Sequence, residues 1–118
     1  MAKDYPETPD GRYFVSKGRL WRKTDPRLPD TDRRAAIKAL MQARRAVQVA
    51  QNDEDVAVAR AAVDAAKRRL GERGPVWWDD GAPDEGRYAP WNSSYATWWE
   101  ELSEAEKAAG LGRAPTGG

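Results

Sequence analysis

A shortage of branched aliphatic residues is the feature that most limits what this chain can fold into. Only 15 of its 118 residues are Leu, Ile, Val or Phe, whereas 20 are Ala and six are Trp. Alanine buries little surface, but a buried indole removes roughly 150–250 Å² from water. At about 25 cal/mol per Å², each buried indole therefore contributes several kcal/mol before entropy is subtracted. We expect the tryptophans mainly to build the core of a single small domain.

The composition argues against several functional classes. The chain has no cysteine and no histidine, so it lacks disulfides, a thiolate nucleophile, the usual zinc ligands and the commonest general base. It also has no phosphate-cradling glycine loop, nucleophile elbow or dinucleotide fingerprint. We predict a non-enzymatic protein with no catalytic residue, no cofactor and no metal. Because no apolar run reaches leader or membrane-spanning length, we expect a cytoplasmic protein that does not contact membranes.

Two short β-prone segments, residues 12–15 and 19–23, follow an extended arm over residues 1–11. The arm ends in a Pro-Asp-Gly sequence, which is typical of a turn. Three residues ending in Gly18 separate the two segments. This spacing predicts a β-hairpin closed by a type I turn with a bulge at Gly18.

The register of this hairpin decides which side chains share a face. The predicted turn places Tyr13 opposite Trp21 and Phe14 opposite Leu20. Tyr13, Val15 and Trp21 then lie on one face, whereas Phe14 and Leu20 lie on the other. Because both faces carry apolar groups, we expect the hairpin to be partly covered on both sides.

Two Ala-rich helices are predicted after a Pro-punctuated connector. The first is capped by Asp30 or Thr31 and ends near Gln51. Its apolar stripe comprises Ile37, Leu40, Met41, Val47 and Ala50. The second follows the acidic break at residues 52–55 and ends at Gly71. Its apolar positions recur at helical spacing and comprise Val56, Ala59, Val63, Ala66 and Leu70. The short break predicts that the two helices run antiparallel.

A Trp-rich loop follows Pro75, and a third helix is predicted from about residue 93. The buried stripe of this helix comprises Tyr95, Trp98, Trp99 and Leu102. Ser103 and Glu106 match a capping box, so the helix is expected to restart or kink there.

The predicted fold is α+β. An N-terminal β-hairpin packs on an antiparallel Ala-rich helical hairpin, and the Trp-rich loop and a short C-terminal helix close the core. Residues 12–110 are expected to form this single domain, with residues 111–118 as a flexible tail after it and residues 1–11 as the arm before it.

Positive charge is concentrated at the front of the chain. Residues 1–45 contain twelve Lys or Arg against six Asp or Glu, whereas residues 46–118 contain eight against thirteen. Basic side chains alternate with aromatic ones along the predicted hairpin, and such a ribbon can bind phosphates while a ring stacks on a base. Structurally, the same pattern also suits exposed strands that avoid edge pairing. The residues predicted to bind DNA or RNA are Arg12, Lys17, Arg19, Trp21, Arg22, Lys23 and Arg27.

The paired tryptophans allow a second functional interpretation. Tryptophan is enriched at protein-binding hot spots, and adjacent rings in a loop can point in different directions. An adaptor that binds a protein partner, or a second copy of the chain, is therefore the alternative hypothesis. The predicted anchors are Trp77, Trp78, Trp98 and Trp99. Core packing competes with this role for each ring.

An acidic cluster in the Trp-rich loop is the third candidate. It comprises Asp79, Asp80, Asp84 and Glu85. Carboxylates can bind Mg²⁺ or Ca²⁺, and a carboxylate pair can serve a small hydrolase as acid and base. The spacing does not match an EF-hand loop, and acidic residues are common in turns. We therefore rank a carboxylate-dependent enzyme below the two binding hypotheses.

Two sequence blocks carry a family resemblance. GRLWR at residues 18–22 and GERGPVWW at residues 71–78 flank a pair of Arg- and Ala-rich helices. In this arrangement the chain resembles a family of small, functionally uncharacterised bacterial proteins over most of residues 9–102. The resemblance implies a bacterial cytoplasmic protein and supplies no catalytic residue.

Overall fold

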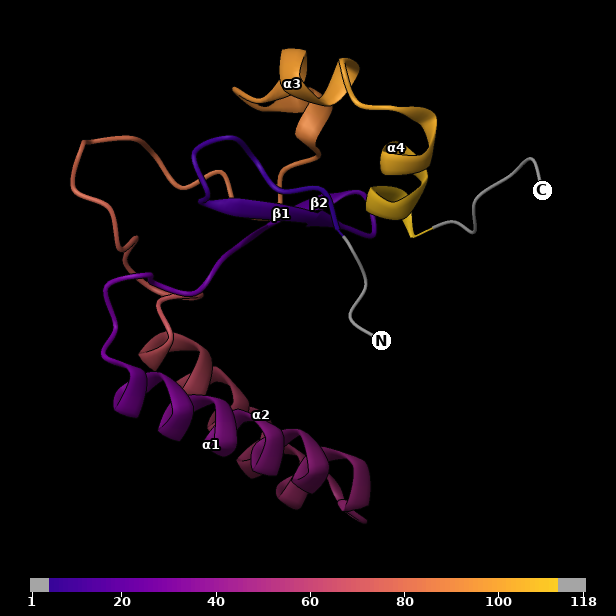
Figure 1. Ribbon diagram of the computed structural model, residues 1–118. Coiled ribbons are helices and arrows are strands. Elements are labelled where there is room, and N and C mark those ends of the chain that lie inside the picture. The colour runs from indigo at the N-terminus through magenta and orange to yellow at the C-terminus, as the bar shows by residue number, and fades with distance from the viewer. Residues whose placement is uncertain (1–4, 113–118) are drawn as a thin grey trace. The chain divides into compact units, whose positions relative to one another are not determined.

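The computed structural model describes residues 5–112, which fold as two compact units (Figure 1). Thr24–Asp80 form one unit, called here the helical unit, and the described residues on either side of it form the hairpin unit. The two-stranded sheet and the helices confirm the predicted α+β class. That residues 12–110 form one domain stays a prediction.

The hairpin consists of β1 (Tyr13–Ser16) and β2 (Arg19–Arg22), which pair antiparallel. The predicted three-residue loop is wrong, because Ser16 pairs with Arg19 and only Lys17 and Gly18 form the turn. Both turn residues have positive φ, 54° at Lys17 and 74° at Gly18. This is the type I′ geometry, whose twist matches that of the flanking strands.

The shorter turn moves each residue of β2 to the face opposite the predicted one. Val15 pairs with Leu20, and Phe14 pairs with Trp21. Tyr13, Val15 and Leu20 are therefore buried on one face, at no more than 1% exposure each. Trp21 shares the half-buried other face with Phe14. A register change of one residue exchanges the two faces of a strand, which explains the incorrect pairing of Tyr13 with Trp21.

Two further segments, one adjacent in sequence and one distant, bind the two outer edges of the hairpin. Residues 5–11 lie along β1, where the Val15 amide donates to the Pro6 carbonyl at 2.9 Å and the Thr8 amide donates to the Tyr13 carbonyl at 3.0 Å. The predicted turn after this segment is confirmed by a bond from the Gly11 amide to the Thr8 carbonyl. Along β2, Leu20 exchanges backbone bonds with the segment at residues 87–88.

The helical unit contains α1 (Asp30–Val49) and α2 (Asp53–Arg69), which pack along each other after a short connection. The stripe predicted for α2 is confirmed, with Ala59, Ala66 and Leu70 buried. In α1 the prediction is partly wrong, because Ile37 and Met41 are 40% and 65% exposed. The buried positions of α1 are Ala36, Leu40 and Ala43. Alanines let the two helix backbones approach closely, so the seam follows them rather than the larger side chains.

Helix α2 has the end signals that its sequence predicts. The Asn52 side chain accepts from the Asp55 amide at 2.8 Å, and acidic residues occupy the first turn. Basic residues occupy the last turn, where they complement the helix dipole. Gly71 then ends the helix with a φ of 80°. For α1, the sequence predicts a cap from the side chain of Asp30 or Thr31. Its N-cap residue is instead Pro29, and no side-chain hydrogen bond caps the helix.

The C-terminal part of the hairpin unit is formed by three short helical segments. They are η1 (Pro90–Asn92), α3 (Ala96–Glu100) and α4 (Glu104–Leu111). The capping box between Ser103 and Glu106 is confirmed, with both reciprocal bonds present. Gly112 ends α4, so the predicted tail begins inside a helix, and residues 113–118 lie outside the described part of the chain.

Candidate nucleic-acid interface

Arg22, one of the predicted phosphate ligands, is an internal residue of the hairpin unit. It is 7% exposed, and its guanidinium lies 3.7 Å from the carboxylate of Asp84. The Tyr13 hydroxyl donates to the same carboxylate at 3.4 Å and accepts from the Glu85 amide at 2.8 Å. Arg22 therefore fixes the loop at residues 84–85 against the hairpin, and its burial argues against the predicted contact with phosphate.

Three further predicted cations form ion pairs with carboxylates that lie close to them in sequence or in space. Arg12 lies 3.9 Å from Asp10, and Lys23 lies 2.8 Å from Glu7. Arg27 belongs to the helical unit, where it pairs with Asp25 at 3.2 Å and donates to the Trp77 carbonyl. The predicted set is thus divided between the two units and partly neutralised. It does not form one continuous basic ribbon along the hairpin.

Lys17 and Arg19 are the two predicted cations that stay exposed at the hairpin turn. They line a pocket of about 390 Å³, called here the hairpin-tip pocket. Its lining comprises Lys17, Gly18, Arg19, Ala89, Trp91 and Leu111, with no acidic side chain among them. One Arg19 nitrogen donates to the Arg87 carbonyl at 3.2 Å, which orients the guanidinium at the pocket.

The pocket forms because α4 and η1 approach the hairpin turn closely. The Gly18 amide donates to the Gly110 carbonyl at 2.9 Å. A side-chain carbon at Gly18 would lie 3.6 Å from the Leu111 Cδ2 atom and 3.7 Å from the Trp91 Cη2 atom. An added carbon would therefore meet both apolar walls at ordinary van der Waals distance. The positive φ of Gly18, and not a lack of space, is what favours glycine at this position.

The tryptophans differ widely in exposure, which decides between core and surface roles. Trp78 and Trp99 are 8% and 5% exposed, so they pack as core residues, and their burial argues against a role as the predicted partner anchors. Trp77 and Trp98 are half-buried. Trp91 is the exposed member of the set, at 44%. The sequence-based site residues omit Trp91, although it lies in the same pocket as two of the predicted cations.

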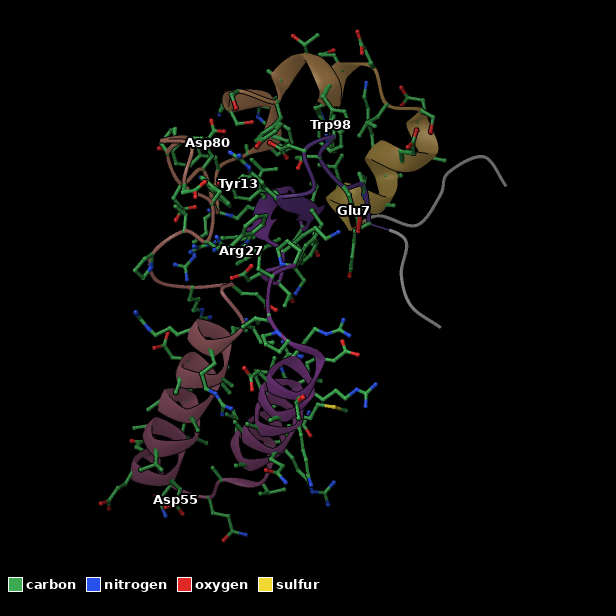
Figure 2. The ribbon with its side chains drawn as sticks, turned by 60° about the vertical axis from the view of Figure 1, so that its left-hand side comes forward. Glu7, Tyr13, Arg27, Asp55, Asp80 and Trp98 are labelled. Carbon is green, nitrogen blue, oxygen red and sulfur yellow. The ribbon has the colours of Figure 1, made fainter. Side chains whose placement is uncertain are left out.

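Ring contacts connect the exposed Trp91 to the core of the hairpin unit. Its centroid lies 5.8 Å from that of Trp99, which lies 6.5 Å from that of Trp98. Trp98 contacts Tyr95, and Tyr95 contacts Tyr13 on β1. Tyr13 and Trp98, at the two ends of these contacts, both belong to the hairpin unit (Figure 2). The five aromatic rings form a continuous series from the buried hairpin face to the hairpin-tip pocket. In the helical unit, Trp77 and Trp78 form a separate edge-to-face pair at 5.1 Å.

The acidic loop has structural partners. Asp84 accepts from the Gly86 amide at 2.8 Å in addition to its contacts with Arg22 and Tyr13. Glu85 accepts from the backbone amide and the hydroxyl of Ser94 at 2.9 and 2.5 Å. Among residues 5–112, no group of three or more acidic side chains is arranged to hold a metal ion. The Asp84 and Glu85 carboxylates thus act as acceptors that order residues 84–94.

Alkaline pH is expected to destabilise the hairpin unit through two phenols, the buried Tyr13 and the half-buried Tyr95. Burial, together with the nearby Asp84 charge, raises the pKa of Tyr13 to about 12. Burial and the hydrogen bond to Asp10 also raise the pKa of Tyr95. The folded protein holds both protons more tightly than the unfolded chain, whose tyrosines titrate near about 10. The contribution of Tyr13 to stability is therefore complete below about pH 10 and is lost as the pH rises through about 12. The contribution of Tyr95 is lost in the same direction, as the pH rises through its own raised pKa.

Denaturant unfolding between neutral pH and about pH 11 checks this expectation. Tyr13→Phe and Tyr95→Phe should each reduce the dependence of the unfolding free energy on alkaline pH. Tyr88→Phe is the matched control, because Tyr88 is 52% exposed. If all three variants keep the slope of the unmodified protein, the two phenols are not responsible for it.

Comparison with protein-family models, curated proteins and solved structures gave no match. The site is therefore interpreted from its own residues. Over residues 5–112, no helix has both the length and the apolar composition needed to cross a bilayer.

Proposed function

We propose that this protein is a non-enzymatic nucleic-acid-binding protein of the bacterial cytoplasm that binds its ligand at the hairpin-tip pocket. The observation that carries the proposal is the placement of two exposed cations beside one exposed indole. Lys17 and Arg19 flank the turn, and Trp91 forms a wall of the same pocket. Lys and Arg that follow a phosphate backbone beside an aromatic platform are the common elements of nucleic-acid grooves.

The distribution of charge supports an anionic ligand at this place. The acidic side chains near the other hairpin cations pair with them, as Glu7 does with Lys23. Among the described residues, in contrast, the pocket lining has two cations and no acidic side chain. Each phosphate that a Lys or Arg neutralises releases condensed counterions, which favours binding at low salt. With two such contacts, we expect a modest affinity and a shallow but measurable dependence of that affinity on salt.

Removing both cations is expected to weaken nucleic-acid binding. In Lys17→Ala/Arg19→Ala, the affinity for a labelled oligonucleotide should fall about tenfold or more at low salt, because two phosphate contacts are lost. Fluorescence anisotropy of the oligonucleotide across a salt series measures this. For the unmodified protein, the log–log slope on a single strand should be about −1.4, the value for two phosphates.

The matched control is Arg44→Ala/Arg45→Ala, which removes the same charge from exposed positions of α1. This variant should bind within about twofold of the unmodified protein if the hairpin tip carries the contacts. Equal losses in both double variants would indicate non-specific attraction to net charge. A flat salt dependence, or no binding to single or double strands at low salt, would refute the proposal.

An adaptor that uses Trp77, Trp78, Trp98 and Trp99 is supported less well. Two of those four rings lie at 8% exposure or less. A hot-spot residue must be accessible in the unbound protein to fill a partner's pocket. Only the half-buried Trp77 and Trp98 retain that capacity, and they lie in different units.

A further inference from the structure

We infer that the hairpin-tip pocket receives one unpaired nucleobase, stacked on Trp91, with the adjoining phosphates on Lys17 and Arg19. The protein would then select single-stranded over double-stranded nucleic acid. This inference rests on the proposed function and adds to it the form of the ligand. Three properties of the pocket support it: a fixed ring, a limited size, and cations beside an apolar wall.

The Trp91 ring is exposed and yet held in place. It contacts Trp99, which is itself 5% exposed, and its Cη2 atom lies 3.7 Å from the position that a side-chain carbon would take at Gly18. Its backbone lies in η1, directly after the buried Pro90. A ring fixed from two sides loses little conformational freedom on binding, so most of its stacking energy is retained in the affinity. Stacking is also tolerant of sequence, because every base has a π face.

The size of the pocket limits what can stack there. At about 390 Å³ it lies at the lower end of the range for small-ligand sites, roughly 300–1,000 Å³. That is room for one base with part of its sugar. In a duplex each base face is already covered by its neighbours, so only an unpaired base can present a face to the indole.

The cations define which planar ligand fits best. Leu111 and Trp91 supply apolar walls, and Lys17 and Arg19 lie on either side of Gly18 in the same lining. The bond from Arg19 to the Arg87 carbonyl occupies one nitrogen, and a guanidinium has five N–H donors in total. A flat apolar group joined to anions therefore matches this pocket better than a neutral sugar or a proline-rich peptide.

Three oligonucleotides of the same length test the inference with the unmodified protein. They are a single strand of about twelve thymidines, the same strand in a duplex, and a strand with the same phosphates whose residues are abasic. The single strand should bind roughly tenfold or more tightly than either of the others, because only it offers unpaired bases. Equal affinity for the thymidine and abasic strands would overturn the stacking inference.

Variants at the ring give a second and independent readout. Trp91→Ala should lower the affinity for the thymidine strand roughly tenfold and leave the affinity for the abasic strand unchanged. Trp91→Phe should retain much of the binding, since phenylalanine also stacks. The control is Tyr88→Ala, which removes an aromatic ring of 52% exposure outside the pocket lining. Circular dichroism of each variant checks that the hairpin unit is folded.

The outcomes separate the two proposals. If Lys17→Ala/Arg19→Ala loses binding while Trp91→Ala and the abasic strand do not, the protein binds nucleic acid through phosphates alone and the stacking inference fails. If Tyr88→Ala loses as much as Trp91→Ala, the stacking site is not the pocket. Absence of binding to any of the three oligonucleotides refutes both proposals together.

Discussion

Replacing Trp99 with alanine is expected to lower the free energy of unfolding of the hairpin unit by about 3–5 kcal/mol. The ring is 5% exposed and contacts both Trp91 and Trp98. It also lies 3.0 Å from the position that a side-chain carbon would take at Gly110, so α4 packs directly on it. Removal of this buried ring leaves a cavity, and the loss of its contacts with α4 and the neighbouring rings accounts for the expected cost.

Urea unfolding followed by far-UV circular dichroism measures this loss, and Trp91→Ala is the matched control. Trp91 is 44% exposed, so less of its surface is buried than that of Trp99 and its removal should cost less, about 2 kcal/mol. Single domains are stable by only about 5–15 kcal/mol, so the Trp99 variant should be close to unfolding. Equal losses for the two variants would contradict the assignment of Trp99 to the core.

Gly71→Ala is expected to have the second largest effect, about 2–4 kcal/mol in the helical unit. Gly71 ends α2 with a φ of 80°, a conformation that costs an alanine about 1–2 kcal/mol. In addition, the new methyl carbon would lie 2.9 Å from the Asp25 Cβ atom and 3.2 Å from the Trp77 Cδ1 atom. The Asp25 amide is itself bonded to the Leu70 carbonyl at 2.8 Å, so that neighbour cannot move away easily.

Gly81→Ala separates the two causes of this expected loss. Gly81 has nearly the same φ, 83°, and no atom within 4 Å of the added carbon. Its substitution should therefore cost only the conformational part, about 1–2 kcal/mol. Thermal unfolding of both variants gives the comparison. If Gly71→Ala is no more destabilising than Gly81→Ala, the close approach of Asp25 to the end of α2 does not contribute to the loss of stability.

The elements of this fold are local in origin, and the sequence predicts them well. The stripe of α2, its Asn52 cap and the Ser103 capping box depend on residues a few positions apart. The hairpin register depends on a turn in which Lys17 adopts a positive φ. Lysine is not among the residues that signal such a turn, so the sequence favours the longer loop ending in Gly18.

The stripe of α1 shows a second limit of pattern reasoning. The pattern of large apolar residues predicts that Ile37 and Met41 are buried. The face of α1 that is buried against α2 instead contains Ala36 and Ala43. Which of two neighbouring faces packs depends on how closely the partner helix approaches, and α1 alone does not contain that information.

The candidate site is the least predictable part, because its residues are far apart in the chain. Lys17 and Arg19 belong to the turn, whereas Trp91 and Leu111 follow more than seventy residues later. A backbone bond between Gly18 and Gly110 brings the two parts together, and no periodicity indicates it. The burial of Arg22 has the same kind of cause, since its carboxylate partner lies at residue 84.

The backbone bonds along both sides of the hairpin have a consequence for behaviour at high concentration. On the β1 side, the Val15 amide donates to the Pro6 carbonyl, and on the β2 side the Leu20 amide donates to the Tyr88 carbonyl. A ribbon with open sides can template the addition of strands from neighbouring molecules, which is the usual route to aggregation. Here residues of the same chain already bond to both edges of the hairpin. The hairpin is therefore protected against the addition of strands from other molecules.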